Sequence, residues 1–504
     1  MSRSCKRISN IIYIIICAAV LTGAAYVMIF SYEGRIIRES IGSAPFVIAA
    51  LSAAAYVLIP AFVSGIRKRP ALLFLYFFIV PALLCALFIP AGFVPDEEKH
   101  FFRALSLSQF RVISGDVCVP ENIYDIFGVK GFDDLIELWS LKASDATYMT
   151  SCTTAIFYAP LSYLPQAIGV WISSLFTDHL YVIFISARLS CLAATTAMLY
   201  LAVRIAPFGK YVIIMLSLLP LFIQEAASVA VDGLSVASVI LMAAFYFYLR
   251  EQKKPFTRGQ IVIMALTVIS VFSVKSAYLL LGFIFMLLPS AGFGGIKRKR
   301  IILLSVYILA ILLPMIYWLL VYFCGFDFSK SVGEGASIMS QLSLLIGDPL
   351  KFPHVLFNTL SANAVWYFKS CFSLLLLSFD MSKASILLLM ICLVVTLLLG
   401  RHTSIGWRNV IFITAASLIT VIMIFGLEYL QWTGTGADTI AGVQGRYFIP
   451  LFFPILCMIR LPHPSQNADG ASAGRGMQIV QTLIISSTAA VALTSLMSAA
   501  ATLL

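Results

Sequence analysis

The sequence has little charge and lacks the short motifs that mark several soluble enzyme classes. Only 11% of its 504 residues are Asp, Glu, Lys or Arg. It contains no Walker A loop, no GxGxxG turn and no HExxH pair, and the missing nucleotide loop argues against a nucleotide-driven pump. The ten cysteines are scattered without CxxC or metal-ligand spacing, so they indicate no zinc or redox centre.

Apolar residues dominate instead, at 61% of the chain with a mean hydropathy of +0.98. Apolar runs of about 17–25 residues recur, and each is long enough to cross a bilayer as a helix. We therefore predict an all-α polytopic membrane protein with about 13 spans. The predicted spans are 11–30, 43–64, 71–93, 181–203, 209–227, 232–249, 260–273, 276–290, 301–323, 384–400, 409–427, 447–460 and 478–500. The first span has a basic start and no clear small-residue cleavage site, so we expect an uncleaved anchor.

Basic residues set the orientation of these spans. Most of the 34 lysines and arginines fall in short loops on one side, including the runs 67–69 and 297–300. Such loops are typically cytoplasmic, which predicts a cytoplasmic N-terminus in the cell membrane. The net charge of +11 therefore reports membrane orientation, and no basic-aromatic motif indicates nucleic-acid binding.

Two hydrophobic stretches do not fit as spans in this orientation. Residues 156–176 contain Pro160 and Pro165, and a crossing there would put the following basic loops on the wrong side. Residues 353–380 contain polar side chains that suit an interface better than a span. We expect both stretches to lie flat or re-enter on the extracytoplasmic side.

The resulting organisation has three parts. Residues 1–65 form an N-terminal transmembrane hairpin, and 66–460 form the membrane core. A cytoplasmic linker, centred on 463–476, and a C-terminal transmembrane helix occupy 461–504. The core carries the extracytoplasmic loops 95–180, 324–383 and 428–446. Cys118 with Cys152, and Cys324 with Cys371, are suggestive outer pairs, although sequence alone establishes no disulfide.

An acidic segment, Pro95-Asp96-Glu97-Glu98-Lys99-His100, opens the first of these loops. Proline followed by acids is also an ordinary helix start, with the acids on the positive end of the helix dipole. His100 and Arg103 would then lie on the face of Glu97. Carboxylates where a membrane helix meets water can also act in acid/base chemistry or bind a cation.

Further motifs follow in order along the chain. The set begins with Tyr158-Ala159-Pro160-Leu161-Ser162-Tyr163-Leu164-Pro165 and Arg188-Leu189, followed by Pro220 and then Glu225 and Val231-Asp232-Gly233 at an outer helix end. It ends with Lys275 between two short apolar halves and Gln444-Gly445-Arg446-Tyr447-Phe448-Ile449-Pro450. With the acidic segment they cover residues of about 70–455. In this order and topology the chain resembles the GT-C superfamily of membrane glycosyltransferases, and most of all the domain-of-unknown-function family 2142.

The resemblance implies an inverting glycosyltransferase on the extracytoplasmic face. The donor would be a polyprenyl-phosphate sugar, and the acceptor a cell-envelope glycan, lipid or protein hydroxyl. Asp96 is the expected general base, with Glu97 as its rival. No single second acid matches the family pattern, since Glu97, Glu98 and Asp116 compete. No protein metal ligand is predicted, and a divalent cation, Mg²⁺ or Mn²⁺, is left open. The substrate-binding residues implied are His100, Arg103, Tyr158, Tyr163, Asp232, Lys275, Gln444, Arg446 and Tyr447.

Each of these residues also has a structural interpretation. Arg446 and Lys275 could extend to lipid head groups, Asp232 could cap a helix, and the tyrosines could belong to the interfacial aromatic belt. Two other functions are open as well. An envelope glycan polymerase or ligase would depend on Arg446 more than on Asp96. A lipid or glycan transporter would need paired charges and interrupted helices within the membrane.

Overall fold

The computed structural model describes most of the chain and is predominantly helical. The described residues are 36, 39, 52–56, 58–60, 63–113, 115–127, 132–326, 332–374, 381–399, 406–458 and 471–503. The predicted spans 11–30 and 43–64, and most of the linker 463–476, therefore lie largely outside them. Within this part, the short helix α4 (Ser64–Arg67) precedes the first long helix.

Six helices of the described part are long and apolar enough to cross a membrane. They are α5 (Pro70–Phe88), α9 (Leu180–Ile205), α12 (Asp232–Glu251), α15 (Ile296–Phe323), α19 (Trp407–Gln431) and residues 478–499 of α21 (Ala471–Leu503). This agrees with a polytopic helical membrane protein. The number of 13 spans and the orientation of the N-terminus stay predictions.

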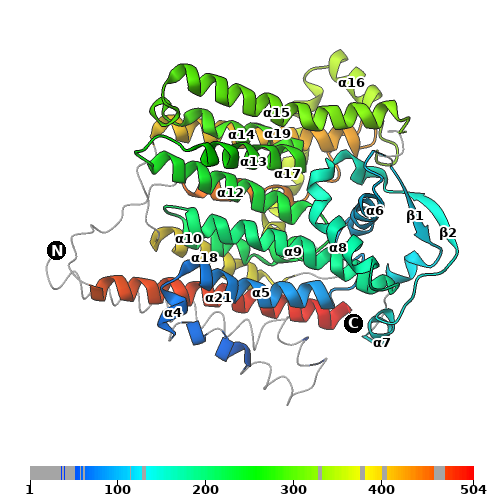
Figure 1. The fold of residues 1–504 in the computed structure, drawn as a ribbon, viewed down its shortest axis with the longest axis horizontal. Helices are drawn as coiled ribbons and strands as arrows, with labels where there is room; N and C mark the ends of the chain where they lie inside the picture. Colours follow the sequence, from blue (N-terminus) through cyan, green and yellow to red (C-terminus); the bar gives the residue numbers. More distant parts are fainter. Residues whose placement is uncertain are drawn as a thin grey trace.

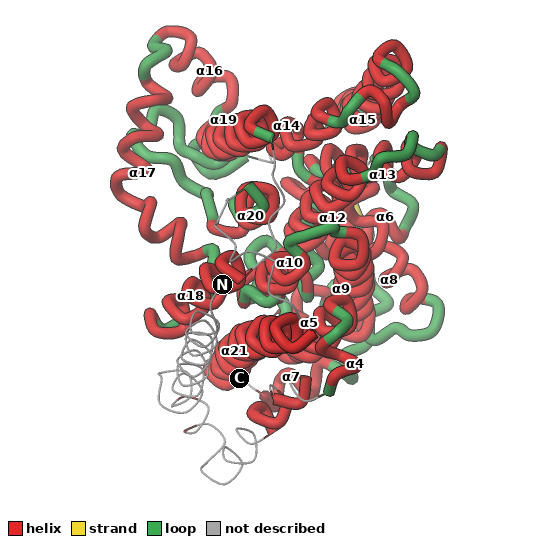
Figure 2. Tube along the Cα trace, turned by 90° about the vertical axis from the view of Figure 1, so that its left-hand side faces the viewer, coloured by secondary structure: helices red, strands yellow, loops and turns green. Residues whose placement is uncertain are grey.

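The long helices lie side by side, and their axes are seen nearly end-on in Figure 2. In Figure 1, α12 lies between α9 and α13 (Arg258–Val274), and α5 and α21 follow below α9. The apolar segment of α12 is 89% buried by protein, whereas those of α15 and α19 are only 33% buried. The exposed sides of α15 and α19 are rich in Leu and Ile, as expected for surfaces that face lipid.

Several predicted spans are interrupted instead of continuous. Residues 209–227 form two short helices, α10 (Lys210–Ser217) and α11 (Pro220–Ala226), because Pro220 cannot continue the hydrogen bonding of the first. Residues 276–290 form η4 (Ser276–Tyr278), α14 (Leu279–Gly282) and η5 (Phe283–Leu287), followed by η6 (Ser290–Phe293). The expectation of a single helix in each stretch was wrong. The stretch 447–460 is likewise split into η8 (Gly445–Tyr447) and the short α20 (Ile449–Leu456).

The polar segment after α5 caps one end of the helix bundle (Figure 1). It contains α6 (Glu97–Ser108), η1 (Ile123–Phe127) and α7 (Phe132–Leu138). Strands β1 (Asp116–Pro120) and β2 (Thr147–Ser151) pair antiparallel, with Cys118 opposite Met149. The described part is therefore predominantly helical, consistent with the predicted all-α polytopic membrane protein, and carries one small two-stranded sheet.

The two predicted interfacial stretches form short or partly exposed helices. Residues 156–176 give η2 (Thr153–Phe157), η3 (Pro160–Tyr163) and α8 (Leu164–Ser174), which packs against α9 and α6. With 11 residues α8 is too short to cross a bilayer alone. The second stretch begins within α17 (Lys351–Ser370), beside α16 (Ile338–Gly347), and its residues 375–380 are not described. Helix α18 (Lys383–Leu399) packs on α21.

Candidate active site

Asp96 lies where the chain leaves α5 and enters α6, and its backbone conformation is unusual. Its φ is 63° and its ψ is 5°, in the left-handed region that few non-glycine residues adopt. It occupies the N-cap position of α6, yet its carboxylate does not cap the helix. The side chain is 40% exposed and accepts a hydrogen bond from Nη2 of Arg446 at 2.9 Å. The backbone thus turns this carboxylate away from its own helix and toward Arg446.

Arg446 is the centre of a cluster of buried charges. Besides Asp96, its guanidinium lies 3.4 Å from Oε1 of Glu225 and 3.6 Å from Oδ2 of Asp232, and it donates to the carbonyl of Pro95 at 3.3 Å. Its side chain is only 2% exposed. Three segments that are distant in sequence (the start of α6, the α11–α12 turn and η8) therefore meet at one guanidinium.

Two local features place these groups. Gly445 sits against the end of α17, where an added Cβ would lie 2.6 Å from the backbone nitrogen of Cys371, so a larger residue would push η8 away. On the other side, the turn between α11 and α12 brings Glu225 and Asp232 to the same end of α12.

Lys275 extends the cluster by one more charge. It ends α13 in an extended conformation, and its Nζ lies 3.4 Å from Oδ1 of Asp232. The same ammonium lies 3.4 Å from the ring centroid of Tyr447, a cation–π contact. The cluster so defined contains the carboxylates of Asp96, Glu225 and Asp232 and the cations of Arg446 and Lys275. We call these five residues the charged cluster.

Glu97, the neighbour of Asp96, lies in a different environment. Its side chain is fully buried, and both its oxygens accept hydrogen bonds from Arg188, at 2.8 Å from Nε and 2.7 Å from Nη2. The backbone nitrogens of Val229 and Gly92 complete its acceptors at 3.1 and 3.4 Å. Arg188 in turn donates to the carbonyls of Ala86 and Ile89 at the end of α5, which would otherwise lack partners there. The pair therefore ties α5, α6 and α9 together.

His100 and two tyrosines border the charged cluster. Nδ1 of His100 lies 2.5 Å from the hydroxyl of Tyr163, and its ring is 5.6 Å from that of Tyr158. Burial lowers the pKa of His100 to about 4, against the opposing attraction of Asp232 and Asp96. For Asp96, burial favours the neutral acid, but Arg446, His100 and Lys99 outweigh it and lower its pKa below the usual value. Near neutral pH, His100 is therefore a neutral imidazole and Asp96 is an ionised carboxylate.

The remaining predicted residues divide into two groups. Tyr447 contacts Lys275, and Gln444 precedes Arg446 with a buried Oε1 that has no hydrogen bond in the described part of the chain. Arg103 instead donates to the carbonyl of Val112 and to the hydroxyl of Tyr317 on α15. These two contacts hold α6 and the segment after it against α15.

Sequence reasoning did not place Glu225, Arg188 or Glu428 in the site. Glu225 lies in a stretch predicted as one continuous span, and only Pro220 indicates the break that turns Glu225 toward Arg446. Glu428 is the first residue of the predicted outer loop 428–446, and it lies close enough to Lys275 and Arg446 to interact electrostatically. Glu428, like Asp96, is an acidic residue at the end of an apolar run, and this feature of the sequence could have identified it as a candidate site residue.

The carboxylates of the charged cluster are the groups in this site that could bind a divalent cation. Within the described residues, no three His, Cys, Asp or Glu side chains are grouped so that they could hold a metal ion. The carboxylates that do converge are already engaged by Arg446 and Lys275. The described residues therefore do not fit a Mg²⁺ or Mn²⁺ site. Cys118, Cys152, Cys324 and Cys371 are all free thiols, so neither suggested disulfide is present.

Comparison with known families identifies residues 137–455 as a match to the model described as a predicted membrane protein (DUF2142). The match covers more than half of the chain. The chain belongs to this family. The DUF2142 region includes Asp232, Lys275 and Arg446, while Asp96 lies before its first residue. No curated protein and no solved structure matches the chain.

Proposed function

We propose that this DUF2142 protein is a membrane glycosyltransferase that moves a sugar from a polyprenyl-phosphate donor to a cell-envelope acceptor. The observation that carries the proposal is the partly exposed, ionised Asp96 carboxylate on the buried Arg446 guanidinium. A carboxylate that water can reach, beside cations that water cannot, offers a base and a phosphate site at one place.

Asp96 would accept the proton of the acceptor hydroxyl. A hydroxyl is a poor nucleophile and gains from a carboxylate within hydrogen-bond reach. Glu97 is less suited, because both its oxygens are saturated by Arg188 and backbone nitrogens in a fully buried position. Among the two candidate bases, exposure and free acceptor capacity therefore favour Asp96.

Arg446 and Lys275 would neutralise the donor phosphate. The Arg446 contact to Asp96 is the most exposed edge of the charged cluster, so it is the one that an incoming phosphate can replace. That exchange would also remove the attraction that lowers the pKa of Asp96, and it would make this carboxylate a stronger base when the donor is bound. Buried acceptor atoms of Glu225, Glu428 and Gln444 that have no hydrogen bond in the described residues are suited to sugar hydroxyls.

The test is a transfer assay with the full chain in nanodiscs. Polyprenyl-phosphate hexoses and N-acetylhexosamines are supplied with an envelope glycolipid fraction, and released polyprenyl phosphate and extended product are measured by mass spectrometry. Wild type should release the carrier, and Asp96→Asn should not. The matched control is Asp178→Asn, since Asp178 is an exposed, ion-paired aspartate outside the charged cluster. Equal transfer by the wild type, Asp96→Asn and Asp178→Asn proteins would refute the proposed base.

A transporter is the second candidate, and the interrupted helices favour it. Half-helices such as α10 and α11 next to buried ion pairs are typical of sites that move substrates across membranes. A transporter would relocate the lipid-linked sugar without releasing the carrier. A glycan polymerase or ligase would release the carrier, but Arg446→Gln should then reduce activity more than Asp96→Asn.

A further inference from the structure

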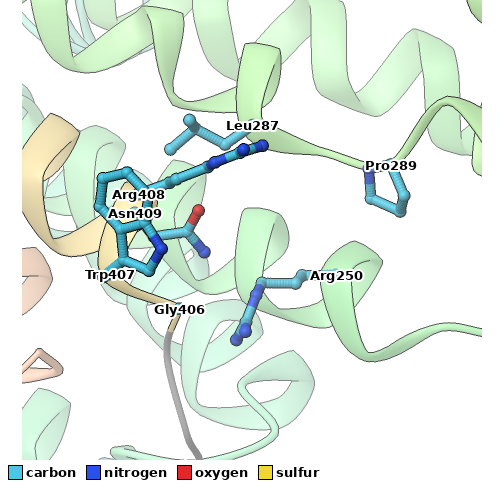
Figure 3. A pocket seen from close by; sticks show the side chains of 7 residues that line it. All are labelled: Arg250, Leu287, Pro289, Gly406, Trp407, Arg408 and Asn409. Carbon is cyan, nitrogen blue, oxygen red and sulfur yellow. The ribbon is translucent and has the colours of Figure 1, made fainter.

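A pocket of about 400 Å³ opens at the far end of α12 from the charged cluster. Asp232 begins α12 and Arg250 lies in its last turn, so about 30 Å of helix separates the two sites. The lining comes from the end of α12, the segment after η5 and the start of α19 (Figure 3). The lining residues are Arg250, Leu287, Pro289, Gly406, Trp407, Arg408 and Asn409.

The polar groups of this pocket converge from two helices. Asn409 is only 9% exposed, and its side-chain amide makes no hydrogen bond to the described residues. Figure 3 shows this amide reaching toward the space between Arg408 and Arg250. The Arg408 guanidinium stacks over the Trp407 ring at 5.7 Å, and Arg250 is held by Glu251 at 3.4 Å. An amide that faces a pocket between two guanidiniums suits a ligand with several acceptor atoms.

We propose that this pocket binds the phosphate group of an anionic phospholipid. Guanidinium groups match phosphate oxygens in pairs, and the start of α19 adds the positive end of a helix dipole. Leu287 and Pro289 give an apolar wall for the glycerol and acyl part, and Trp407 is a typical interfacial side chain.

The position of the pocket favours a lipid as the source of this phosphate. The basic runs at 250–258 and 297–300 predict that this end of α12 is cytoplasmic, where anionic lipids attract basic residues close to the bilayer. Inorganic phosphate would meet the same side chains, so the experiment must separate the two sources. The inference is independent of sugar transfer, because no member of the charged cluster contributes to the pocket.

The experiment uses the full chain in phosphatidylcholine nanodiscs with graded fractions of phosphatidylglycerol. Bound lipid is counted by native mass spectrometry, and the midpoint of thermal unfolding is followed in parallel. Wild type should retain phosphatidylglycerol and be stabilised saturably. Arg408→Gln should weaken that binding about tenfold, or about 1.4 kcal/mol. The control Arg258→Gln removes the same charge from the same end of the molecule but not from the pocket, and it should bind as wild type does.

A second arm adds inorganic phosphate to nanodiscs of phosphatidylcholine alone. Stabilisation there, lost in Arg408→Gln, would support the phosphate site and identify a soluble ligand. Two results would overturn the proposal: no saturable effect of either ligand on wild type, or equal weakening in Arg408→Gln and Arg258→Gln. If Arg408→Gln does not fold, the same measurements on Asn409→Ala, together with the titration of wild type with phosphatidylglycerol, test the proposal in its place.

Discussion

Asp96 and Glu97 are consecutive acids, each paired with an arginine, and they differ in almost every physical respect. The Asp96 carboxylate is 40% exposed and shares one guanidinium with two other acids. The Glu97 carboxylate is fully buried, has a guanidinium to itself and accepts two further backbone hydrogen bonds. Under the proposed function, the first arrangement exchanges the Asp96 carboxylate for a ligand. The second cannot do so without leaving a charge buried, which is costly.

This contrast shows that one peptide unit divides the acidic motif into an exposed half, which is the reactive half under the proposed function, and a buried structural half. The left-handed backbone at Asp96 directs its side chain outward, and the helix that begins at Glu97 directs the next side chain into the protein. Such a backbone conformation costs on the order of 1–3 kcal/mol and tends to occur at functional sites. The neighbouring Glu97–Arg188 pair links α5, α6 and α9 directly beside this backbone conformation.

The largest expected effect is on the structural half. Glu97→Gln leaves the Arg188 guanidinium buried without a counter-charge, and we expect a loss of about 3–5 kcal/mol in stability. Thermal unfolding in detergent, with the yield of monodisperse protein, measures this loss. The pair replacement Glu97→Leu with Arg188→Met should recover only part of it, because Arg188 also binds carbonyls at the end of α5. Unchanged stability in Glu97→Gln would contradict the structural role.

The next effect is on the reactive half, where activity and stability should separate. Asp96→Asn should reduce transfer by about 10²–10⁴-fold, the usual contribution of a general base. Loss of the ion pair with Arg446 should lower its unfolding midpoint only slightly, because Arg446 keeps Glu225 and Asp232 and Asn adopts the left-handed conformation readily. Asp96→Ala should be equally inactive and also less stable by about 1–2 kcal/mol, since Ala does not tolerate φ near +63°. Normal transfer by a well-folded Asp96→Asn protein would assign the role elsewhere.

How far the sequence predicted this site depends on the kind of signal each residue left. Asp96, Arg446, Lys275 and Asp232 each interrupt an apolar run with a charge, and the structure brings these four together. Arg103 was predicted from its place just after the acidic segment, but it contacts Tyr317 and Val112 instead. The sequence indicates that a charged side chain near the membrane has an interaction partner, but it does not identify the partner residue.

The interrupted helices could not be predicted for a different reason. Residues 209–227 are mostly apolar, so hydropathy predicts one span there, and only Pro220 marks the break. Glu225, buried beyond that break, was therefore assigned to a helix end instead of to the Arg446 guanidinium. The long helices α5, α9, α12, α15, α19 and α21 were predictable, because length and hydropathy alone specify them.

A smaller effect is expected in the loop that carries Arg446 to Asp96. Gly442 has a φ of +86°, and an added Cβ would lie 2.6 Å from Oε2 of Glu428 and 3.2 Å from Cβ of Trp432. Gly442→Ala should therefore lower stability by roughly 1–2 kcal/mol and weaken transfer by displacing the loop. Gly434→Ala in the same loop is the control, since nothing lies within 4 Å of its added Cβ. Equal unfolding midpoints for the two variants would show that the loop adapts.

The smallest effect is expected from pH, between about 6 and 8. The pKa of His100 is lowered to about 4 by burial, and that of Asp96 is held below its usual value by Arg446 despite burial. Neither group then changes protonation in this window, so transfer measured across it should show no step from His100 or Asp96. Asp96→Asn cannot test this, but His100→Gln can, because its pH profile should run parallel to that of wild type.

Stability should respond at lower pH, with a defined sign. Between the ordinary histidine pKa of 6.5 and the folded value of about 4, the unfolded chain binds a proton at His100 that the folded chain does not. Stability therefore falls as pH decreases through that window, by up to about 1.4 kcal/mol per pH unit for one group. Below it, protonation of Asp96 removes the ion pair with Arg446 and lowers stability further. Unfolding midpoints of wild type and His100→Gln from pH 7 to 4.5 measure the difference, and the variant should lose less stability over that range. A wild-type midpoint that rises on acidification would mean that His100 is charged in the folded protein, and the neutral imidazole beside Asp96 would have to be abandoned.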